Sequence, residues 1–497
     1  MITEKTSSFT NIEEPAPRSK WLSLIFAFLA ILVGLAIAFS AGEYGSLILL
    51  AVPLLIVFVF ALSQPQLGLV AFIVITFTQF SEVGIKFHGY GSIAQPLAGF
   101  LLVLIVLRIA LYGERPEGFG RALPILVIYA LVWFASLLHA GNYLAALNAF
   151  IGFAKDALGA VIVIFFIQRP SSLKQAVWAI IFAGLFMTAI SIFQEFSGTF
   201  SNNYWGFGGW QHQTTGDSTR HRLTGPYANP NAYAQVLVMI VPLAIDRLWH
   251  ERRMILRILA GVTAALCTLT IAFTYSRGGF LTLIFVTAML ITLRRPNLMP
   301  MLLTGALLIG VVQFIPASYN TRILTLLQFV DQGTQVSDPS FRGRTSENIA
   351  AWQMFMDNPL LGVGLGNFPE NYQNYSRSIG LDQRRVPRSP ASLYLELLSE
   401  QGLIGTGIFL FLMVLIFREL RYAKRNFNLA RMTDEGNIVL ALSAGFAGYL
   451  FAAITKNSAY SNVFWVIVGV ALASGQVAHA SRMKAEEIIV DQPEYGS

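Results

Sequence analysis

Long apolar runs separated by polar connections repeat along the chain. Each run is about 18 residues or longer, the length that a helix needs to cross roughly 30 Å of hydrocarbon. The runs lack the ten-residue alternation of membrane β-barrels. We therefore predict an all-α polytopic membrane protein with about fourteen transmembrane helices. These begin near Trp21, Ser46, Leu69, Ile93, Ala122, Leu144, Ala176, Asn231, Leu256, Phe280, Met301, Leu393, Ile438 and Val463.

Two of these spans carry polar residues in unusual places. The run from Leu69 to Gly89 is polar in its second half, and the run that begins at Leu144 holds the charged pair Lys155-Asp156 in mid-helix. Ionisable side chains inside a span are costly, so both runs depart from the pattern of a simple transmembrane helix.

Composition agrees with the pattern. Hydrophobic residues make up 55% of the chain, charged residues only 12%, and the mean hydropathy is +0.59. A soluble protein could not bury so much apolar surface. The net charge of +7 would suggest nucleic acid in a soluble protein. Here the basic residues lie mainly in connections between spans, so they indicate orientation and predict no nucleic-acid partner.

Basic residues are distributed unevenly between the two sets of connections. With the N-terminus in the cytoplasm, the short outer connections hold only Lys86, Arg277 and Lys456. The positive-inside rule therefore predicts that both termini are cytoplasmic. The expected organisation is a cytoplasmic tail (1–20), N-terminal transmembrane helices (21–197), a catalytic-type region (198–417) with outer loops 198–230, 276–279 and 318–393, C-terminal transmembrane helices (418–480) and a cytoplasmic tail (481–497).

The two long outer loops contain arginine and no lysine. The first carries Arg220 and Arg222, and the second carries Arg322, Arg342, Arg344, Arg377, Arg384, Arg385 and Arg388. Guanidinium groups bind phosphate bidentately, whereas lysine acts as a point charge. Arg277 lies in a tight turn that restricts its movement. These arginines predict a site for a lipid-borne phosphate or pyrophosphate, although an arginine near a span end often only anchors to headgroups.

The longest loop also contains a helix and a glycine-rich turn. Residues 345–357 predict a helix capped by Thr345 or Ser346 and ended by Asn358-Pro359. Its residues Ile349, Trp352, Phe355 and Met356 share one face, so we expect it to lie in the membrane interface. The glycines at 362, 364 and 366 allow a tight irregular turn.

If the bound pyrophosphate is a leaving group, transfer of the group it carries to an acceptor hydroxyl needs a general base. The outer loops offer seven carboxyl or imidazole side chains, although each one alone is more commonly a solvated or capping group. They contain no Asp-x-Asp pair, so we predict no metal ion and no cofactor, and Asp331 and Asp338 remain the alternative metal ligands. The seven candidates are His212, His221, Glu347, Glu370, Asp382, Glu396 and Glu400.

Four segments together resemble the O-antigen ligase and O-antigen polymerase superfamily, in the family's order and with similar spacing. The resemblance covers about residues 220–407. The segments are Arg222-Leu-Thr-Gly-Pro-Tyr-Ala-Asn-Pro-Asn231, Ser276-Arg-Gly-Gly279, Asn358-Pro-Leu-Leu-Gly-Val-Gly-Leu-Gly-Asn-Phe368 and Tyr394-Leu-Glu-Leu-Leu-Ser-Glu-Gln-Gly-Leu-Ile-Gly405.

The resemblance implies a GT-C-like glycosyltransferase in the bacterial inner membrane, acting at its periplasmic face without a metal. Such proteins transfer a glycan from undecaprenyl pyrophosphate to lipid A-core or to another lipid-linked glycan. By position, Arg222 and Arg277 would bind the pyrophosphate, with Arg344, its neighbour Arg342 and Arg220 as further candidates. Tyr394, Glu396 and Asn231 are expected to support the site.

One position departs from the family pattern. A histidine that is thought to act as the base usually precedes the x-Tyr-Leu segment, and Ala391 occupies that place here. Either this chain uses another base, or it has lost activity, or the histidine was deliberately replaced. We predict a weakly active or inactive chain.

Two other functions compete with glycan transfer. Some relatives have been labelled inorganic-carbon transporters, and a transporter of a small anion such as bicarbonate would need ionisable residues lining a path through the spans. Apart from Lys155-Asp156 the spans offer few. A receptor or scaffold without chemistry is compatible with the sequence but does not require arginine-only loops. The residues do not decide between ligase and polymerase.

Overall fold

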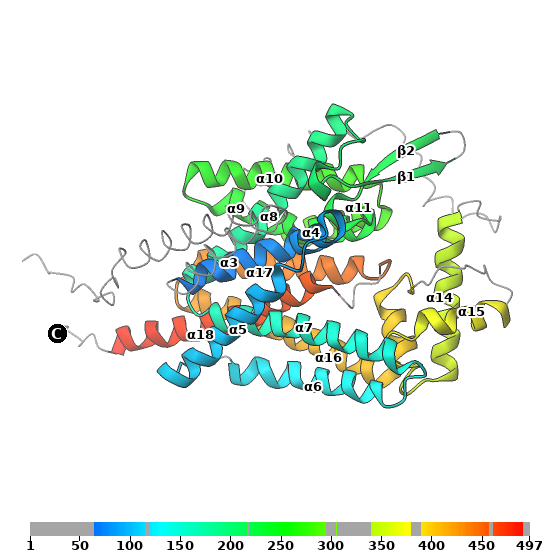
Figure 1. Cartoon of the computed structure of the whole chain (residues 1–497). Coiled ribbons are helices and arrows are strands. Elements are labelled where there is room, and N and C mark those ends of the chain that lie inside the picture. Colours follow the sequence, from blue (N-terminus) through cyan, green and yellow to red (C-terminus); the bar gives the residue numbers. More distant parts are fainter. Residues whose placement is uncertain are drawn as a thin grey trace, which may run out of the picture. The chain divides into compact units, whose positions relative to one another are not determined.

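The computed structural model describes residues 64–114, 119–215, 218–294, 305, 339–378, 389–456 and 461–490. The chain divides into two compact units, residues 1–68 and 69–497. In the first unit the description covers residues 64–68, which begin helix α3. The elements, with the labels of Figure 1, are α3 (Pro65–Phe77), α4 (Phe80–His88), α5 (Ala94–Tyr112), α6 (Phe119–Leu137), α7 (Tyr143–Phe166), α8 (Pro170–Ser197), η2 (Tyr204–Gly206), β1 (Trp210–Thr215), β2 (Ser218–Leu223), η3 (Gly225–Tyr227), α9 (Pro230–His250), α10 (Met254–Phe273), α11 (Arg277–Arg294), α14 (Pro339–Asp357), α15 (Phe368–Ser378), α16 (Leu393–Leu429), α17 (Thr433–Ala452) and α18 (Asn462–Val490).

The prediction of an all-α polytopic membrane protein is confirmed. In the described part of the chain, nine helices are long and apolar enough to cross a membrane, or ten if α3 and α4 form one span bent by 55°. The expected count of about fourteen is not confirmed. The spans expected near Trp21, Ser46 and Met301 lie outside the described residues, and the one near Ala122 falls on α6, whose described apolar part is only Leu126–Leu137.

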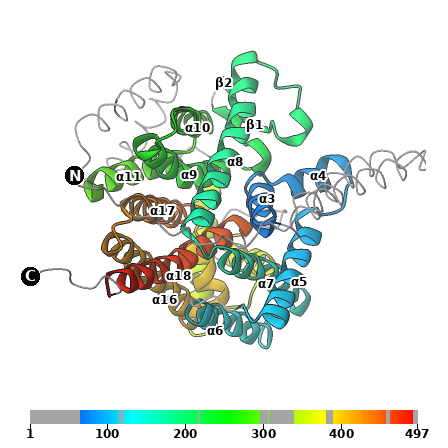
Figure 2. The same ribbon diagram turned by 90° about the vertical axis from the view of Figure 1, so that its left-hand side faces the viewer.

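The spanning helices run roughly along one direction, and α14 crosses it (Figure 1). The hairpin β1–β2, α14 and α15 lie at one end of this bundle, called here the hairpin end. Figure 2 views the bundle along the helices, with α9, α10 and α11 on one side, α5, α6 and α7 on the other, and α18 between them.

Close backbone approach holds the spans together. A Cβ atom at Gly445 of α17 would lie 2.6 Å from the carbonyl oxygen of Met239, and one at Gly469 of α18 would lie 2.9 Å from that of Ala160. Small residues at such crossings let helices pack where lipid removes most of the hydrophobic driving force. Aromatic rings fill the adjoining core, where Trp133 and Phe153 stack with centroids 4.3 Å apart.

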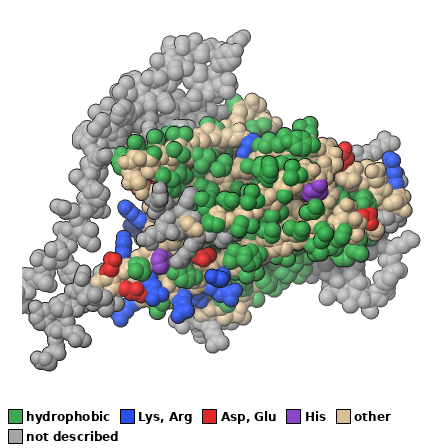
Figure 3. All heavy atoms as spheres, turned by 90° about the horizontal axis from the view of Figure 1, so that it is seen from below, with side chains coloured by type: hydrophobic (Ala, Val, Ile, Leu, Met, Phe, Trp, Pro, Cys, Tyr) green, Lys and Arg blue, Asp and Glu red, His purple; other side chains and the backbone are tan. Residues whose placement is uncertain are grey.

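The end opposite the hairpin is tied together by ion pairs, of which those made by Asp246 are buried and that of Lys174 is half-exposed. Arg247 Nη2 lies 2.6 Å from Asp246 Oδ2 and 2.8 Å from Asp434 Oδ1. Lys174 Nζ lies 2.8 Å from Asp434, and Arg294 also pairs with Asp246. These contacts join α8, α9, α11 and α17. Figure 3 shows basic side chains gathered at one end of the apolar surface, the end at which α18 runs out.

Candidate functional site

Arg222 is held in place at the hairpin end. It lies on β2, opposite Gln211 of β1 in the antiparallel register. Its Nε donates to the carbonyl oxygen of Thr274 at 2.8 Å, and its Nη2 donates to Asn231 Oδ1 at 3.3 Å. Two fixed partners, one after α10 and one at the start of α9, therefore orient the guanidinium group. Asn231 supports it directly.

Arg277 is the first residue of α11, three residues after Thr274. Ser276 caps this helix, because its Oγ accepts from the Gly279 N–H at 3.2 Å. A Cβ atom at Gly279 would lie 2.7 Å from Ala234 Cβ, and one at Gly278 would lie 2.5 Å from Thr455 Oγ1. The glycines thus allow the turn to lie against both the start of α9 and the segment after α17. Because the turn is packed on both sides, the Arg277 backbone has a fixed position.

The start of α16 lies against the same segment after α17. The Leu393 N–H donates to the Ala453 carbonyl oxygen at 3.0 Å, and Tyr394 Oη donates to the Leu450 carbonyl oxygen at 2.9 Å. Ala391 is two residues before this contact, so it and the Arg277 turn flank residues 453–455. The tyrosine therefore positions the helix start.

Three helix N-termini meet around these residues. α9 begins at Pro230, α11 at Arg277 and α16 at Leu393, all at the hairpin end. A helix N-terminus presents backbone N–H groups and about half a positive charge, so it attracts anions. Together with Arg222 and Arg277, the three termini make this a positive region suited to a phosphate or pyrophosphate group.

Arg344 extends the charged region through Lys456. The Lys456 side chain interacts electrostatically with Glu396 of α16 and with Arg344 and Glu347 of α14. Burial is the main cause that lowers the pKa of Lys456, and Arg344 lowers it further, whereas Glu396 and Glu347 act to raise it. Because Thr455 touches the Arg277 turn, this cluster adjoins the first two arginines. Glu347 and Glu396 are both buried.

A glycine-rich turn supports the α16 start from its other side. Val363 and Gly364 donate through their backbone N–H groups to the carbonyl oxygens of Ser399 and Glu400, at 2.8 and 3.0 Å. Leu403 N–H donates to the Pro359 carbonyl oxygen at 2.8 Å. Helix α16 breaks at Gly402, where φ is 61° and ψ is −161°. The two sequence segments 358–368 and 394–405 are thus paired through their backbones.

The predicted irregular turn is confirmed. Gly362, Gly364 and Gly366 have φ values of 69°, 96° and 65°. The predicted helix over 345–357 is also present, but α14 begins at Pro339, so the expected cap at Thr345 or Ser346 is wrong. Both residues lie inside the helix, whose earlier turns carry no hydrophobic periodicity in the sequence.

The four residues expected on one apolar face of α14 separate into two groups. Ile349, Trp352 and Met356 are 41%, 50% and 55% exposed, whereas Phe355 is buried. The opposite side packs on α15 through a cluster that includes Ala350, Ala351 and Met354. An exposed apolar face on a helix that crosses the bundle direction fits the expected location in the membrane interface.

Several predicted site residues are not described in full. The side chains of Arg220 and Arg342 lie outside the described set, as do Arg322, Arg384, Arg385, Arg388 and Asp382. Arg377 is exposed on α15. Among the base candidates, Glu400 accepts from the Phe368 N–H at 3.3 Å and so supports the glycine turn.

Two features of the site escaped the sequence analysis. The hairpin β1–β2 was not predicted, although the Gly-Asp dipeptide at 216–217 between polar, β-branched segments is a turn signal. Lys456 was not proposed for the site. Its signal is that it is one of only three basic residues in the short outer connections.

His221 on the hairpin stacks on Phe200 with centroids 4.0 Å apart and lies 4.6 Å from the Trp210 ring. Burial between these rings lowers its pKa, and His212 lowers it further. The hairpin packing thus favours the neutral form of His221 over the protonated form.

A comparison with known protein families finds a match over part of this site. Residues 262–410 match the family described as O-Antigen ligase. The match covers the Arg277 turn, α14, the glycine-rich turn and the start of α16, and it begins after Arg222. A search of curated proteins finds no match.

Proposed function

We propose that this chain, whose residues 262–410 match the O-antigen ligase family, transfers a glycan from undecaprenyl pyrophosphate to an acceptor hydroxyl. The family supports a membrane enzyme of the ligase or polymerase kind. The acceptor is lipid A-core or another lipid-linked glycan. The proposed location is the inner membrane, with the hairpin end facing the periplasm.

The observation that carries the proposal is the meeting of Arg222 and Arg277 with the N-termini of α9, α11 and α16. Each of these elements favours negative charge, and together they suit two adjacent phosphates better than one carboxylate. A polyprenyl pyrophosphate carries such a group at the membrane surface, where the spanning helices begin.

Glycan transfer breaks the bond between the sugar anomeric carbon and the pyrophosphate oxygen. The departing pyrophosphate gains negative charge in the transition state, and fixed guanidinium and N–H donors stabilise it there. Arg222 is already oriented by Thr274 and Asn231, so little reorganisation accompanies the reaction. We assign pyrophosphate binding to Arg222 and Arg277. Arg344 adds positive charge to the same region, because it interacts with Lys456.

The acceptor hydroxyl gives up its proton as it attacks the anomeric carbon. Ala391 cannot take that proton, although it occupies the position at which the family carries a histidine. Glu347 and Glu396 are described carboxyl groups at the charged region, where both interact with Lys456. We therefore expect slow transfer in this chain and faster transfer when position 391 is histidine.

The transport hypothesis has one structural argument in its favour, the pair Lys155-Asp156. Both residues line a cavity at the ends of α5 and α18 nearest the hairpin. A transport path would have to continue from this cavity to the opposite end of the helix bundle. Glycan transfer accounts better for Arg222 and Arg277, which lie at the hairpin end.

The decisive experiment offers the purified full-length chain a lipid-linked glycan with either lipid A-core or a second lipid-linked glycan. Wild type and Ala391→His are compared, and products are resolved by electrophoresis and mass spectrometry. Transfer to lipid A-core would identify a ligase, and a lengthened lipid-linked glycan a polymerase. No product from either protein, with no binding of undecaprenyl pyrophosphate, would contradict the proposal.

A further inference from the structure

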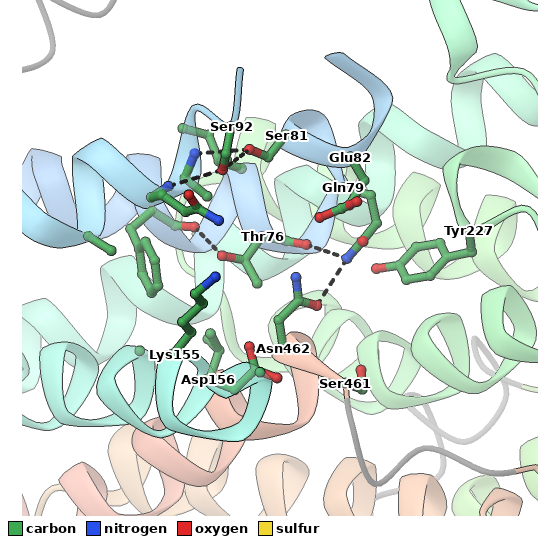
Figure 4. A pocket seen from close by; sticks show the side chains of 18 residues that line it. Thr76, Gln79, Ser81, Glu82, Ser92, Lys155, Asp156, Tyr227, Ser461 and Asn462 are labelled. Atoms are coloured by element: carbon green, nitrogen blue, oxygen red, sulfur yellow. Dashed lines mark hydrogen bonds between the residues drawn. The ribbon is translucent and has the colours of Figure 1, made fainter. Parts of the chain in front are cut away.

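A polar cavity of about 610 Å³ lies beside the arginine region and is not used by the mechanism above. Its lining comes from the break between α3 and α4, the start of α5, the middle of α7, η3 and the start of α18 (Figure 4). This volume falls within the roughly 300–1,000 Å³ typical of small-molecule sites. The cavity therefore has room for a ligand.

The position of the cavity explains the charged pair in α7. Lys155 and Asp156 are in mid-helix by sequence, but they face the ends of neighbouring helices, because Ala94 at the start of α5 and Asn462 at the start of α18 line the same cavity. Helix α7 extends further toward the hairpin end than these helices do (Figure 1). The pair thus lies level with the starts of two neighbouring spans, a depth at which we expect charged groups to cost less than at the bilayer centre.

The helix break forms one wall and is held open by the lining residues. Gln79 has φ 53° and ψ 30°, a left-handed conformation that is uncommon for a residue other than glycine. Its Nε2 donates to the Thr76 carbonyl oxygen at 2.9 Å and to Asn462 Oδ1 at 3.1 Å. Tyr227 Oη donates to the Phe77 carbonyl oxygen at 2.5 Å. Broken helices whose freed carbonyls are satisfied in this way commonly border binding sites in membrane proteins.

The chemistry of the lining disfavours a phosphate. Its described residues include one ammonium group, from Lys155, and two carboxyl groups, from Asp156 and Glu82. Phosphate binding sites instead collect arginines or N–H groups, as the neighbouring region does. The remaining polar groups are amides and hydroxyls, which match a ligand with many hydroxyl groups.

A second cavity connects this one with the Arg222 segment. It shares Gln79, Glu82 and Tyr227 with the first cavity and is also lined by residues 209–211 and 224–228. Gln211 faces Arg222 across the hairpin. A ligand in the polar cavity would therefore lie beside the segment that carries Arg222.

We propose that the cavity between α3, α5, α7 and α18 is a saccharide subsite, in which Asp156, Glu82 and Lys155 bind sugar hydroxyl groups of the lipid-linked glycan. The inference rests on the proposed function for the identity of the ligand. It adds a site for the sugar to the site for the pyrophosphate.

The test separates sugar binding from pyrophosphate binding. Affinities of the full-length chain in nanodiscs are measured for undecaprenyl pyrophosphate alone and for a panel of undecaprenyl-pyrophosphate-linked disaccharides. We expect Asp156→Asn and Glu82→Gln to bind the bare lipid as wild type does. The gain in affinity on adding the disaccharide should be about tenfold smaller in each variant than in wild type. Glu487→Gln, an exposed change on α18 at the opposite end, serves as the control.

Three results would overturn the subsite. In the first, the sugars add no affinity in wild type. In the second, they add as much affinity in Asp156→Asn and Glu82→Gln as in wild type. In the third, native mass spectrometry shows that the cavity retains phosphatidylethanolamine and that Asp156→Asn releases it. Failure of wild type to bind the bare lipid would count against the pyrophosphate site and hence the proposed function. Unchanged binding of the bare lipid by the variants shows that they are folded.

Discussion

Replacing Gly402 with alanine should destabilise the protein, although alanine normally stabilises a helix by up to about 1 kcal/mol relative to glycine. Gly402 has φ 61° and ψ −161°, a conformation that is essentially restricted to glycine. A Cβ atom there would also lie 2.4 Å from the backbone C and O atoms of Leu360. The side chain cannot be accommodated by a rotamer change, because its contacts are backbone atoms.

The magnitude follows from two contributions. Backbone strain in this region of φ and ψ costs about 1–3 kcal/mol. Displacing the 359–364 turn weakens its backbone hydrogen bonds to α16, and losing two of them costs about 1–3 kcal/mol more. We therefore expect Gly402→Ala to lower the free energy of unfolding by roughly 2–6 kcal/mol.

The assay is thermal unfolding of the purified chain in detergent, followed by intrinsic fluorescence and by the fraction that stays monodisperse. Gly407→Ala is the matched control, because it lies on the same helix and a Cβ atom there meets nothing within 4 Å. We expect a clear fall in apparent Tm for Gly402→Ala and an unchanged or higher value for Gly407→Ala. Equal values for the two variants would refute the argument.

Three further changes test the site. Arg222→Lys should weaken binding of undecaprenyl pyrophosphate about 10- to 100-fold, because lysine cannot keep both hydrogen bonds and bind phosphate bidentately; Arg377→Lys, an exposed change on α15, should leave the affinity as it is. Ala391→His should raise the rate of glycan transfer about 10²–10⁴-fold by supplying a base, and an unchanged rate would contradict the assignment of that position. Because burial lowers the pKa of His221, the unfolded state binds the proton more readily below about pH 6.5, so stability should fall as the pH drops through that range. His221→Gln should remove part of this fall in a pH series of Tm values, whereas equal pH dependence in variant and wild type would show that His221 does not contribute.

The membrane helices could be predicted from the sequence because an apolar run of sufficient length has few alternatives to a span. Arg222, Arg277 and Arg344 could likewise be assigned to one end of the bundle, because the spans between them fix the side on which each loop emerges. The glycines at 362, 364 and 366 indicated an irregular turn directly, since they permit positive φ. Each of these features is encoded locally.

Features that depend on distant contacts could not be predicted. The break at Gly402 exists because the turn around Leu360 packs against it, and an isolated glycine in an apolar run gives no sign of that partner. The depth of Lys155 depends on where α5 and α18 begin, not on its place within α7. The role of Lys456 requires α14 and α16 to lie beside the end of α17. The domain boundaries remain predictions.

The ion pairs among α8, α9, α11 and α17 bear on which parts of the protein move during turnover. They fasten the far ends of the two helices that begin at Pro230 and Arg277, so we expect these helices to shift together. The spacing between Arg222 and Arg277 is consequently preset before any lipid arrives. At the hairpin end, α16 is held instead by backbone hydrogen bonds to Ala453 and to the 359–364 turn.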